Sequence, residues 1–278
     1  MTTSRAQQEL EALEIELLLE AVFRHYGFDF REYAPASLQR RIANAIQAEG
    51  VKTVSGLQER VLHDPACLER FLLALSVNVT AMFRDPEFYL AFRRRVVPIL
   101  RTYPSIQIWH AGCASGEEVY SMAILLEEEG LAPRARLYAT DMNDSVLQQA
   151  RAGIFPLEYM KDYTSNYLSA GGKRSFSDYY TAGYGNAIFR AALRENVTFA
   201  QHNLVTDGAF NTFHVIWCRN VTIYFKKSLQ RRVHNLLYDS LIMLGILGLG
   251  SKETIQATPH EGEYDVLVPG EKLYRKVR

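Results

Sequence analysis

The sequence predicts an α/β protein built on a doubly wound, mostly parallel β-sheet, with a small all-helical domain before it and a small antiparallel β-subdomain inserted in it. Three observations support this prediction. The stretch 106–143 has the pattern of strand, small-residue loop, helix and second strand, the first half of a doubly wound nucleotide-type site. Residues 214–218 form a near-continuous apolar run, as in a buried parallel strand. Residues 1–76 show only helical patterns.

These patterns divide the chain of 278 residues into a helical N-terminal domain at 1–76 and an α/β domain at 77–278. A hydrophobic fraction of 48% is sufficient for one large domain or two unequal ones. Residues 157–201 are rich in Tyr, Gly and Ser and break the alternation of strands and helices, so we interpret most of this segment as the inserted element. Its expected extended segments are 176–180, 187–190 and 197–201.

Four helices are expected in the N-terminal domain. The first carries a stripe at helical spacing that is expected to face the core, and its members are Leu10, Leu13, Leu17 and Ala21. Ser37 and Ser55 are the expected N-caps of the second and third helices, and Asp64-Pro65 gives the fourth a capping acid and a first-turn proline. Arg40 and Arg41 are expected on the second helix, on the side away from its apolar face.

The α/β domain has its own start and stop signals. Asp85-Pro86 begins a helix, and the three arginines at 93–95 are expected to form a solvated face of it. The polar cluster at 143–145 caps a helix that Gly153 ends. Ser228 caps a helix to about residue 241, a buried strand follows at 245–250, and 264–268 with 273–277 form a closing hairpin.

The loop at 111–116 indicates which ligand the sheet holds. Small residues such as Gly112 let the backbone pass close to a ligand, and Asp141 ends the second strand, where a ribose diol is commonly held. The loop lacks the Gly-x-Gly-x-x-Gly pattern and continues into Glu117-Glu118, which would repel a pyrophosphate. A ligand with a cationic amino-acid end and an adenosine end fits better, so the loop favours S-adenosylmethionine over NAD. An NAD-dependent oxidoreductase remains the alternative enzyme class.

Composition excludes several functions. Lys and Arg total 31, as do Asp and Glu, so no global field favours nucleic acid. The three cysteines and seven histidines show no metal-ligand spacing and no disulfide framework, which predicts no metal and a reducing cytoplasm. The N-terminus is polar and acidic, unlike a signal peptide, and the longest apolar run, 241–249, is too short to span a bilayer.

Several motifs together resemble one family. Residues 78–85, Asn-Val-Thr-Ala-Met-Phe-Arg-Asp, resemble the Asn-x-Thr-x-Phe-Phe-Arg stretch of CheR-type protein-glutamate O-methyltransferases, enzymes that methylate chemoreceptors. The stretch 111–121 is similar to their cofactor loop, 139–141 to their second strand end, 218–225 to their fourth and 250–253 to their fifth. The similarity runs in order over about residues 10–278. Met82 and Val119 replace the usual Phe and Pro, which are mild changes.

The resemblance implies a class I methyltransferase domain and a role for each matched position. Asn78, Thr80 and Arg84 would line the cofactor and substrate cleft, with Gly112 in the cofactor loop. Glu117 would bind the methionine end of the cofactor and Asp141 the ribose, with Asn203 and Leu204 along the adenine. Arg219, Asn220 and Tyr224 would close the site near the methyl group.

The residues alone leave structural alternatives open. Asp141 could cap a helix, and Glu117 could be an acid that the helix dipole favours. Arg84 could pair with a neighbouring acid, Arg219 could be a solvated strand end, and Tyr224 could belong to the core.

The expected chemistry is an in-line displacement in which a substrate carboxylate oxygen attacks the sulfonium methyl group. A glutamate has a reference pKa of about 4.3 and is already ionised near neutral pH, so no general base is needed. Catalysis would then depend on proximity and alignment, with Arg84 and Tyr224 orienting the carboxylate. S-adenosylhomocysteine would be the product.

The resemblance also implies a partner, an acidic helical segment of a chemoreceptor or a related signalling protein. Arg40 and Arg41 resemble the basic helix that family members use against acidic receptor helices, although a solvated face explains them equally well. Two alternatives have no chemoreceptor substrate. One is a cofactor-binding signalling module without activity, and the other is a methyltransferase that acts on another signalling protein.

Overall fold

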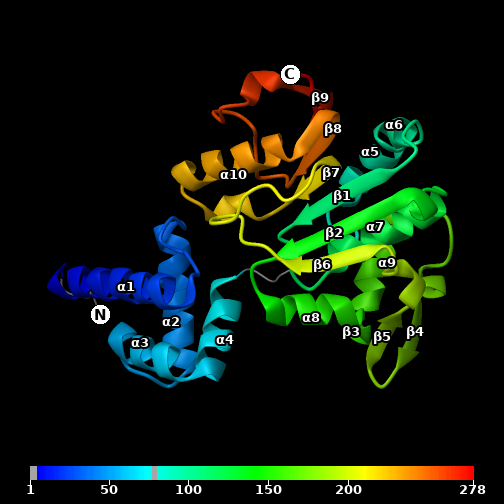
Figure 1. Ribbon diagram of the computed structural model, residues 1–278. Coiled ribbons are helices and arrows are strands. Elements are labelled where there is room, and N and C mark those ends of the chain that lie inside the picture. Colours follow the sequence, from blue (N-terminus) through cyan, green and yellow to red (C-terminus); the bar gives the residue numbers. More distant parts are fainter. Residues whose placement is uncertain (1–4, 77–79) are drawn as a thin grey trace. The chain divides into compact units, whose positions relative to one another are not determined.

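The computed structural model describes residues 5–76 and 80–278, and the chain divides into two compact units (Figure 1). The helical unit comprises Met1–Val77 and Tyr224–Gln230, and the α/β unit comprises Asn78–Ile223 and Arg231–Arg278. The segment 224–230, which the sequence-based division assigned to the α/β domain, is thus grouped with the N-terminal helices. No helix in the described ranges is long and apolar enough to cross a membrane.

The helical unit contains α1 (Arg5–Tyr26), α2 (Pro35–Ala48), α3 (Val54–His63) and α4 (Pro65–Leu75). The predicted core stripe of α1 is wrong, because Leu10, Leu13 and Leu17 are 57%, 52% and 52% exposed. The helix instead buries a second apolar face, consisting of Ile15, Leu18, Leu19 and Val22. Apolar residues lie on both faces of this helix, so helical spacing alone could not show which face packs on α3.

The helix starts of this unit differ from two of the three predictions. Asp64 caps α4 as predicted, accepting a hydrogen bond from the Ala66 amide at 2.9 Å. Helix α2 begins at Pro35, two residues before the expected Ser37 cap, because a proline suits a first-turn position. Thr53, not Ser55, caps α3 through the Gly56 amide at 3.0 Å. Ser55 lies inside the first turn, and its hydroxyl donates to Glu14 of α1.

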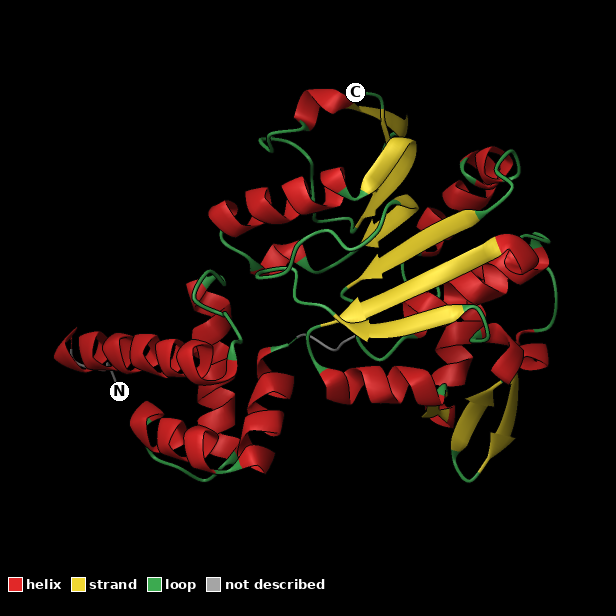
Figure 2. Cartoon of the chain, in the orientation of Figure 1, coloured by secondary structure: helices red, strands yellow, loops and turns green. Residues whose placement is uncertain are grey.

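The main sheet of the α/β unit has seven strands, and the predicted doubly wound, mostly parallel architecture is confirmed (Figure 2). The strands, in spatial order, are β6 (Val197–Gln201), β2 (Ala135–Asp141), β1 (Ile106–Ala111), β7 (Phe213–Cys218), β8 (Leu241–Leu249), β10 (Leu273–Lys276) and β9 (Tyr264–Val268). The first five are parallel, and β10 and β9 form the predicted closing hairpin. The direction of winding reverses between β1 and β7, which places a ligand crevice beyond their carboxyl ends.

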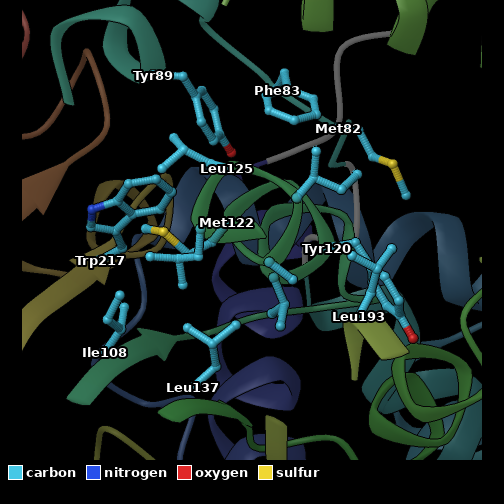
Figure 3. Packing of buried hydrophobic residues seen from close by; sticks show 14 of the residues in the cluster. Met82, Phe83, Tyr89, Ile108, Tyr120, Met122, Leu125, Leu137, Leu193 and Trp217 are labelled. Carbon is cyan, nitrogen blue, oxygen red and sulfur yellow. The ribbon is translucent and has the colours of Figure 1, made fainter. Parts of the chain in front are cut away.

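The other α-helices among the described residues are α5 (Pro86–Arg95), α6 (Val97–Leu100), α7 (Glu117–Glu128), α8 (Asp144–Ala152), α9 (Met160–Ser169) and α10 (Lys227–Asp239). Figure 3 shows the core of the α/β unit, where Tyr89 of α5 and Met122 and Leu125 of α7 pack with Trp217 of β7. The Tyr89 and Trp217 rings are 5.3 Å apart. This packing positions the start of α5 and the start of α7 relative to the sheet.

The inserted element is smaller than predicted. Its antiparallel sheet has the order β3 (Ile154–Pro156), β5 (Asn186–Phe189), β4 (Tyr180–Gly183). The expected strand at 197–201 is instead β6, the edge strand of the main sheet, where Leu137 of β2 pairs with Val197 in parallel. Residues 176–179 form a 3₁₀ turn, and α9 was not expected. Short extended patterns do not show which sheet a strand joins.

Three consecutive glutamates at the end of α7, Glu127, Glu128 and Glu129, connect that helix to the insert. Arg93, expected on a solvated face, is instead buried and pairs with Glu128 and with Glu129, the latter at 2.9 Å. Arg101, after α6, also pairs with Glu129, at 3.0 Å. The insert adds further partners, namely Tyr167, Lys173, Arg174, Tyr179 and Arg190. The prediction that all three arginines at 93–95 are solvated is therefore wrong for Arg93.

Candidate functional site

The loop after β1 is held tightly against two neighbouring strand ends. The amides of Gly112 and Cys113 both donate to the Thr140 carbonyl, at 2.8 and 2.9 Å. Gly112 has φ +78°, and a Cβ there would lie 2.7 Å from a methyl group of Val221, which follows β7. Only glycine fits this position without strain, and the backbone is left open to a ligand.

Asp141 ends β2 beside this loop. Its carboxylate accepts hydrogen bonds from the Ala114 amide at 3.0 Å and from the Asn143 amide at 3.1 Å. Burial raises the pKa of Asp141. The Met142 amide is a third donor to this carboxylate. A carboxylate has about four acceptor positions, so three amides leave about one position for a ribose hydroxyl. Asn143, not Asp141, caps α8, through the Ser145 amide at 2.9 Å.

Glu117 is the first residue of α7 and is only 6% exposed. It accepts a hydrogen bond from the Ser115 hydroxyl at 2.7 Å and another from Tyr163 of α9. Burial raises the pKa of Glu117. No Lys or Arg of the described residues forms a salt bridge with Glu117, so the cationic end of a ligand would compensate the cost of burying this carboxylate.

The segment 80–85 lies next to α7. The Phe83 amide donates to the Ser121 hydroxyl at 2.9 Å, and that hydroxyl donates to the Glu117 carbonyl at 2.7 Å. Phe83 is fully buried, whereas Thr80 and Arg84 are half-buried. The predicted site residue Asn78 lies outside the described residues.

The segment after β6 places the two residues expected near the adenine. Leu204 is buried. Asn203 is half-buried and accepts a hydrogen bond from the Val205 amide at 3.0 Å through its side-chain oxygen. Both follow a strand that neighbours β2, the strand of Asp141, so they share the carboxyl edge of the sheet.

Arg219 and Asn220 follow β7 at the same edge. Arg219 is buried, and its guanidinium pairs with Asp85 at 2.9 Å and with Glu118 at 3.1 Å. Asn220 has φ +61°, a left-handed conformation that few residues adopt without support. Its amide donates to Glu253 at 2.8 Å.

Sequence reasoning missed Glu253, although 250–253 was recognised as a strand ending. This buried carboxylate accepts five hydrogen bonds, from the amides of Gly250, Asn220, Val221 and Thr222 and from the Thr222 hydroxyl. Glu118 and Tyr163 were also missed. The pair of glutamates at 117–118 could have indicated Glu118. Nothing in the sequence indicates that α9, which carries Tyr163, lies against Glu117.

Three predicted residues lie in the helical unit. Tyr224 accepts the Ala34 amide at 2.8 Å through its carbonyl oxygen, and its ring lies 4.8 Å from the Arg41 guanidinium. Arg41 also donates to the Leu75 carbonyl and is buried, and burial lowers its pKa. The expectation that Arg41 lies on an open basic face is therefore wrong. Arg40 is exposed.

These geometries fit the donor set that S-adenosylmethionine requires: a carboxylate for its ammonium group, a carboxylate for its ribose and a small-residue loop between them. No group of three or more metal-ligating side chains occurs in the ranges 5–76 and 80–278.

Comparison with known proteins gives consistent matches. Residues 78–266 match the family "CheR methyltransferase, SAM binding domain", and residues 13–76 match "CheR methyltransferase, all-alpha domain". The "Putative methyltransferase Cher3" of Pseudomonas putida is 50% identical over 264 residues, covering 95% of this chain and 97% of that protein. The "Chemotaxis protein methyltransferase" of Listeria innocua is 27% identical, covering 84% of this chain and 87% of that protein.

A solved methyltransferase from Geobacter sulfurreducens in complex with S-adenosyl-L-homocysteine is 16% identical. It has a TM-score of 0.34 and covers 61% of this chain and 49% of that one, which is too distant to support an argument. The family matches together span both units. The cofactor of this chain is S-adenosylmethionine, and the chain belongs to the CheR methyltransferase family.

Proposed function

We propose that this methyltransferase modifies glutamate side-chain carboxylates of a signalling protein, with the acidic cytoplasmic helix of a chemoreceptor as the first candidate. The products are glutamate methyl esters and S-adenosylhomocysteine. The names of the Listeria and Pseudomonas aeruginosa relatives, each a chemotaxis protein methyltransferase, support this acceptor.

The observation that carries the proposal is the placement of Arg84. It lies between Phe83, whose amide bonds to Ser121 of α7, and Asp85, which forms an ion pair with Arg219 just after β7. An arginine held next to α7 in this way can offer a planar donor fork that suits a carboxylate. Tyr224 is proposed as a second orienting group.

When bound, S-adenosylmethionine supplies an electrophilic methyl group. The residues of the chain bind and align the reactants. Glu117 holds the ammonium end, Asp141 holds the ribose, and Gly112, Asn203, Leu204 and Asn220 shape the surface between them. Since a glutamate of the acceptor is already ionised near neutral pH, the site requires no general base, and alignment becomes the main contribution.

The proposal is tested with methyl-labelled cofactor and a purified chemoreceptor cytoplasmic fragment. Carboxyl methyl esters release volatile methanol in mild alkali, whereas methylamines do not, so the released label identifies the linkage. Label that stays on the protein after alkali would reject carboxylate methylation. A receptor fragment in which the methylated glutamates are replaced by glutamine is the control and should accept no label.

Cofactor affinity should fall as pH is lowered through the raised pKa of Glu117. The ionised carboxylate binds the ammonium group, so below that pKa a proton must leave before the ligand binds. The association constant for S-adenosylhomocysteine should then decrease by about tenfold per pH unit. Calorimetry from pH 7 downward measures this, and Glu117→Gln should bind more weakly at pH 7 with a flatter pH profile. An equally steep profile in Glu117→Gln would assign the titration to Asp141, whose pKa is also raised by burial.

Acceptor binding should depend on Arg40, the exposed arginine of α2. Arg40→Glu is expected to raise KM for the acceptor protein by about three- to tenfold at low salt, with a smaller effect at high salt because exposed charges are screened. Arg94→Glu, the same charge reversal at an exposed position of α5, is the matched control. Equal KM changes in the two variants, or no change in Arg40→Glu, would remove Arg40 from the acceptor site.

A further inference from the structure

A cluster of charged side chains, largely buried except for Asp85, joins four elements at the carboxyl edge of the sheet. Its members are His110 at the end of β1, Glu118 in the first turn of α7, Arg219 after β7 and Asp85 before α5. We infer that Arg219 and Glu118 are positioning residues that hold the Arg84 turn in place against the cofactor loop, and that the Arg219 guanidinium acts on the protein and not on the cofactor. The inference rests on the proposed role of Arg84.

Both terminal nitrogens of the Arg219 guanidinium bond to the protein, whereas its buried Nε has no hydrogen-bond partner in the part of the chain that the structure describes. One terminal nitrogen is 3.1 Å from Glu118, and the other is 2.9 Å from Asp85 and 3.1 Å from the Arg84 carbonyl oxygen. The guanidinium carbon lies 4.1 Å from the centre of the Phe88 ring. With 2% of its side chain exposed, Arg219 acts as a cross-link between α7 and the turn before α5.

Glu118 is held in turn from the sheet. His110, which is fully buried, makes a 2.9 Å hydrogen bond to Glu118 through Nδ1. Burial alone would raise the pKa of Glu118, but the bond to His110 and the charge of Arg219 lower it overall. The carboxylate is therefore ionised, and it fixes Arg219 to the same helix turn that carries Glu117.

The turn at residues 83–85, which Arg219 contacts, has a backbone conformation that needs support from neighbouring side chains. Phe83 has φ +51° and Asp85 has φ +58°, so the two residues that flank Arg84 both adopt the left-handed conformation. Each such residue is unfavourable outside glycine and persists only where surrounding contacts impose it. Ser121 holds the Phe83 amide, and Arg219 holds the Arg84 carbonyl and the Asp85 carboxylate. The direction of the Arg84 side chain depends on both restraints.

A second buried arginine provides a matched control. Arg93 has 6% of its side chain exposed, pairs with two carboxylates, Glu128 and Glu129, and donates to the Ala170 carbonyl at 3.1 Å. Its environment thus resembles that of Arg219, but it links α5 to the far end of α7 and to the residue after α9. A lysine substitution at either arginine keeps the charge and loses the fork that spans several acceptors.

The experiment compares Arg219→Lys with Arg93→Lys. Arg219→Lys is expected to lower kcat at saturating cofactor by about tenfold, because it acts only through the direction of Arg84, and to change the Kd for S-adenosylhomocysteine by less than about threefold. Arg93→Lys should lower the thermal midpoint of unfolding by about as much as Arg219→Lys does. It should keep kcat within about twofold of the wild-type value. A Kd that rises as much as kcat falls would make Arg219 a cofactor ligand, and equal kcat losses in both variants would reduce the effect to destabilisation. Either result overturns the inference.

A second measurement needs no acceptor protein. The Nε–Hε NMR signal of Arg84, assigned by its loss in Arg84→Lys, should shift in Arg219→Lys and in Glu118→Gln but not in Arg93→Lys. An unchanged signal in Arg219→Lys overturns the inference. A shifted signal together with a wild-type enzyme that does not methylate the receptor fragment would leave the positioning role intact and reject the proposed acceptor.

Discussion

Arg84→Lys is expected to lower kcat by about tenfold, and Arg84→Ala by about a hundredfold or more. The lysine variant loses part of the alignment of the acceptor carboxylate, and the alanine variant loses the orienting side chain altogether. Lysine keeps the positive charge but presents a point charge in place of a planar fork. Cofactor affinity should fall less than kcat in both variants. Single-turnover methyl transfer at saturating cofactor measures the chemical step, and calorimetry measures binding separately.

The structure makes the Arg84 experiment more specific. Arg84 is flanked by two residues in left-handed conformations, so the backbone is imposed by Ser121 and Arg219 and should survive the substitution. A wild-type rate in Arg84→Lys would mean that the fork geometry is irrelevant. A wild-type rate in Arg84→Ala would remove the residue from catalysis and leave orientation to Tyr224 and Asn220.

Asp141→Ala is the second change with a large expected effect. Losing hydrogen bonds to a charged acceptor costs about 1.5–3 kcal/mol, so the Kd for S-adenosylhomocysteine should rise about ten- to a hundredfold. The substitution also leaves the amides of Ala114 and Asn143 without their acceptor, which should place the effect near the upper end. Asp141→Asn retains one oxygen acceptor and should be intermediate. Calorimetry with S-adenosylhomocysteine gives the three values.

Asp144 is a suitable control for Asp141. It is an exposed acid three residues further along, and it contacts Gln148 and Arg151 of its own helix. Asp144→Ala should leave the Kd unchanged within about twofold, because surface ion pairs contribute little. If folded Asp141→Ala binds as tightly as Asp144→Ala, the carboxylate only organises the loop, and the ribose must be held elsewhere.

Local signals in the sequence predicted much of the fold. Asp64 and the polar cluster at 143–145 were predicted as caps, and Asp64 and Asn143 accept from amides two residues away, an interaction that depends only on nearby sequence. The buried strand β7 was visible as an apolar run because a strand covered on both faces needs no polar residues. Such signals require no knowledge of the tertiary contacts.

The features that could not be predicted depend on contacts distant in the sequence. Glu253 bonds to amides some thirty positions away, and nothing near it in the sequence indicates that it closes the loop of Asn220. Arg41 has the same local setting as Arg40, yet only Arg41 meets the Leu75 carbonyl and the Tyr224 ring. In α1, two apolar faces compete, and the choice depends on the surface that α3 offers.

The three glutamates at the end of α7 have a consequence for truncating the protein. A helix carries partial negative charge at its C-terminal end, so consecutive acids there are intrinsically unfavourable. Here Lys173, Arg174 and Arg190 of the insert neutralise them, together with Arg93 of α5 and Arg101. The insert therefore supplies positive charge that compensates the C-terminal end of α7, the helix whose first residue is Glu117. A shortened version without the insert would remove both arginine partners of Glu127 and leave, among the described residues, only Arg93 and Arg101 for Glu128 and Glu129, so a minimal catalytic domain should retain residues 160–190.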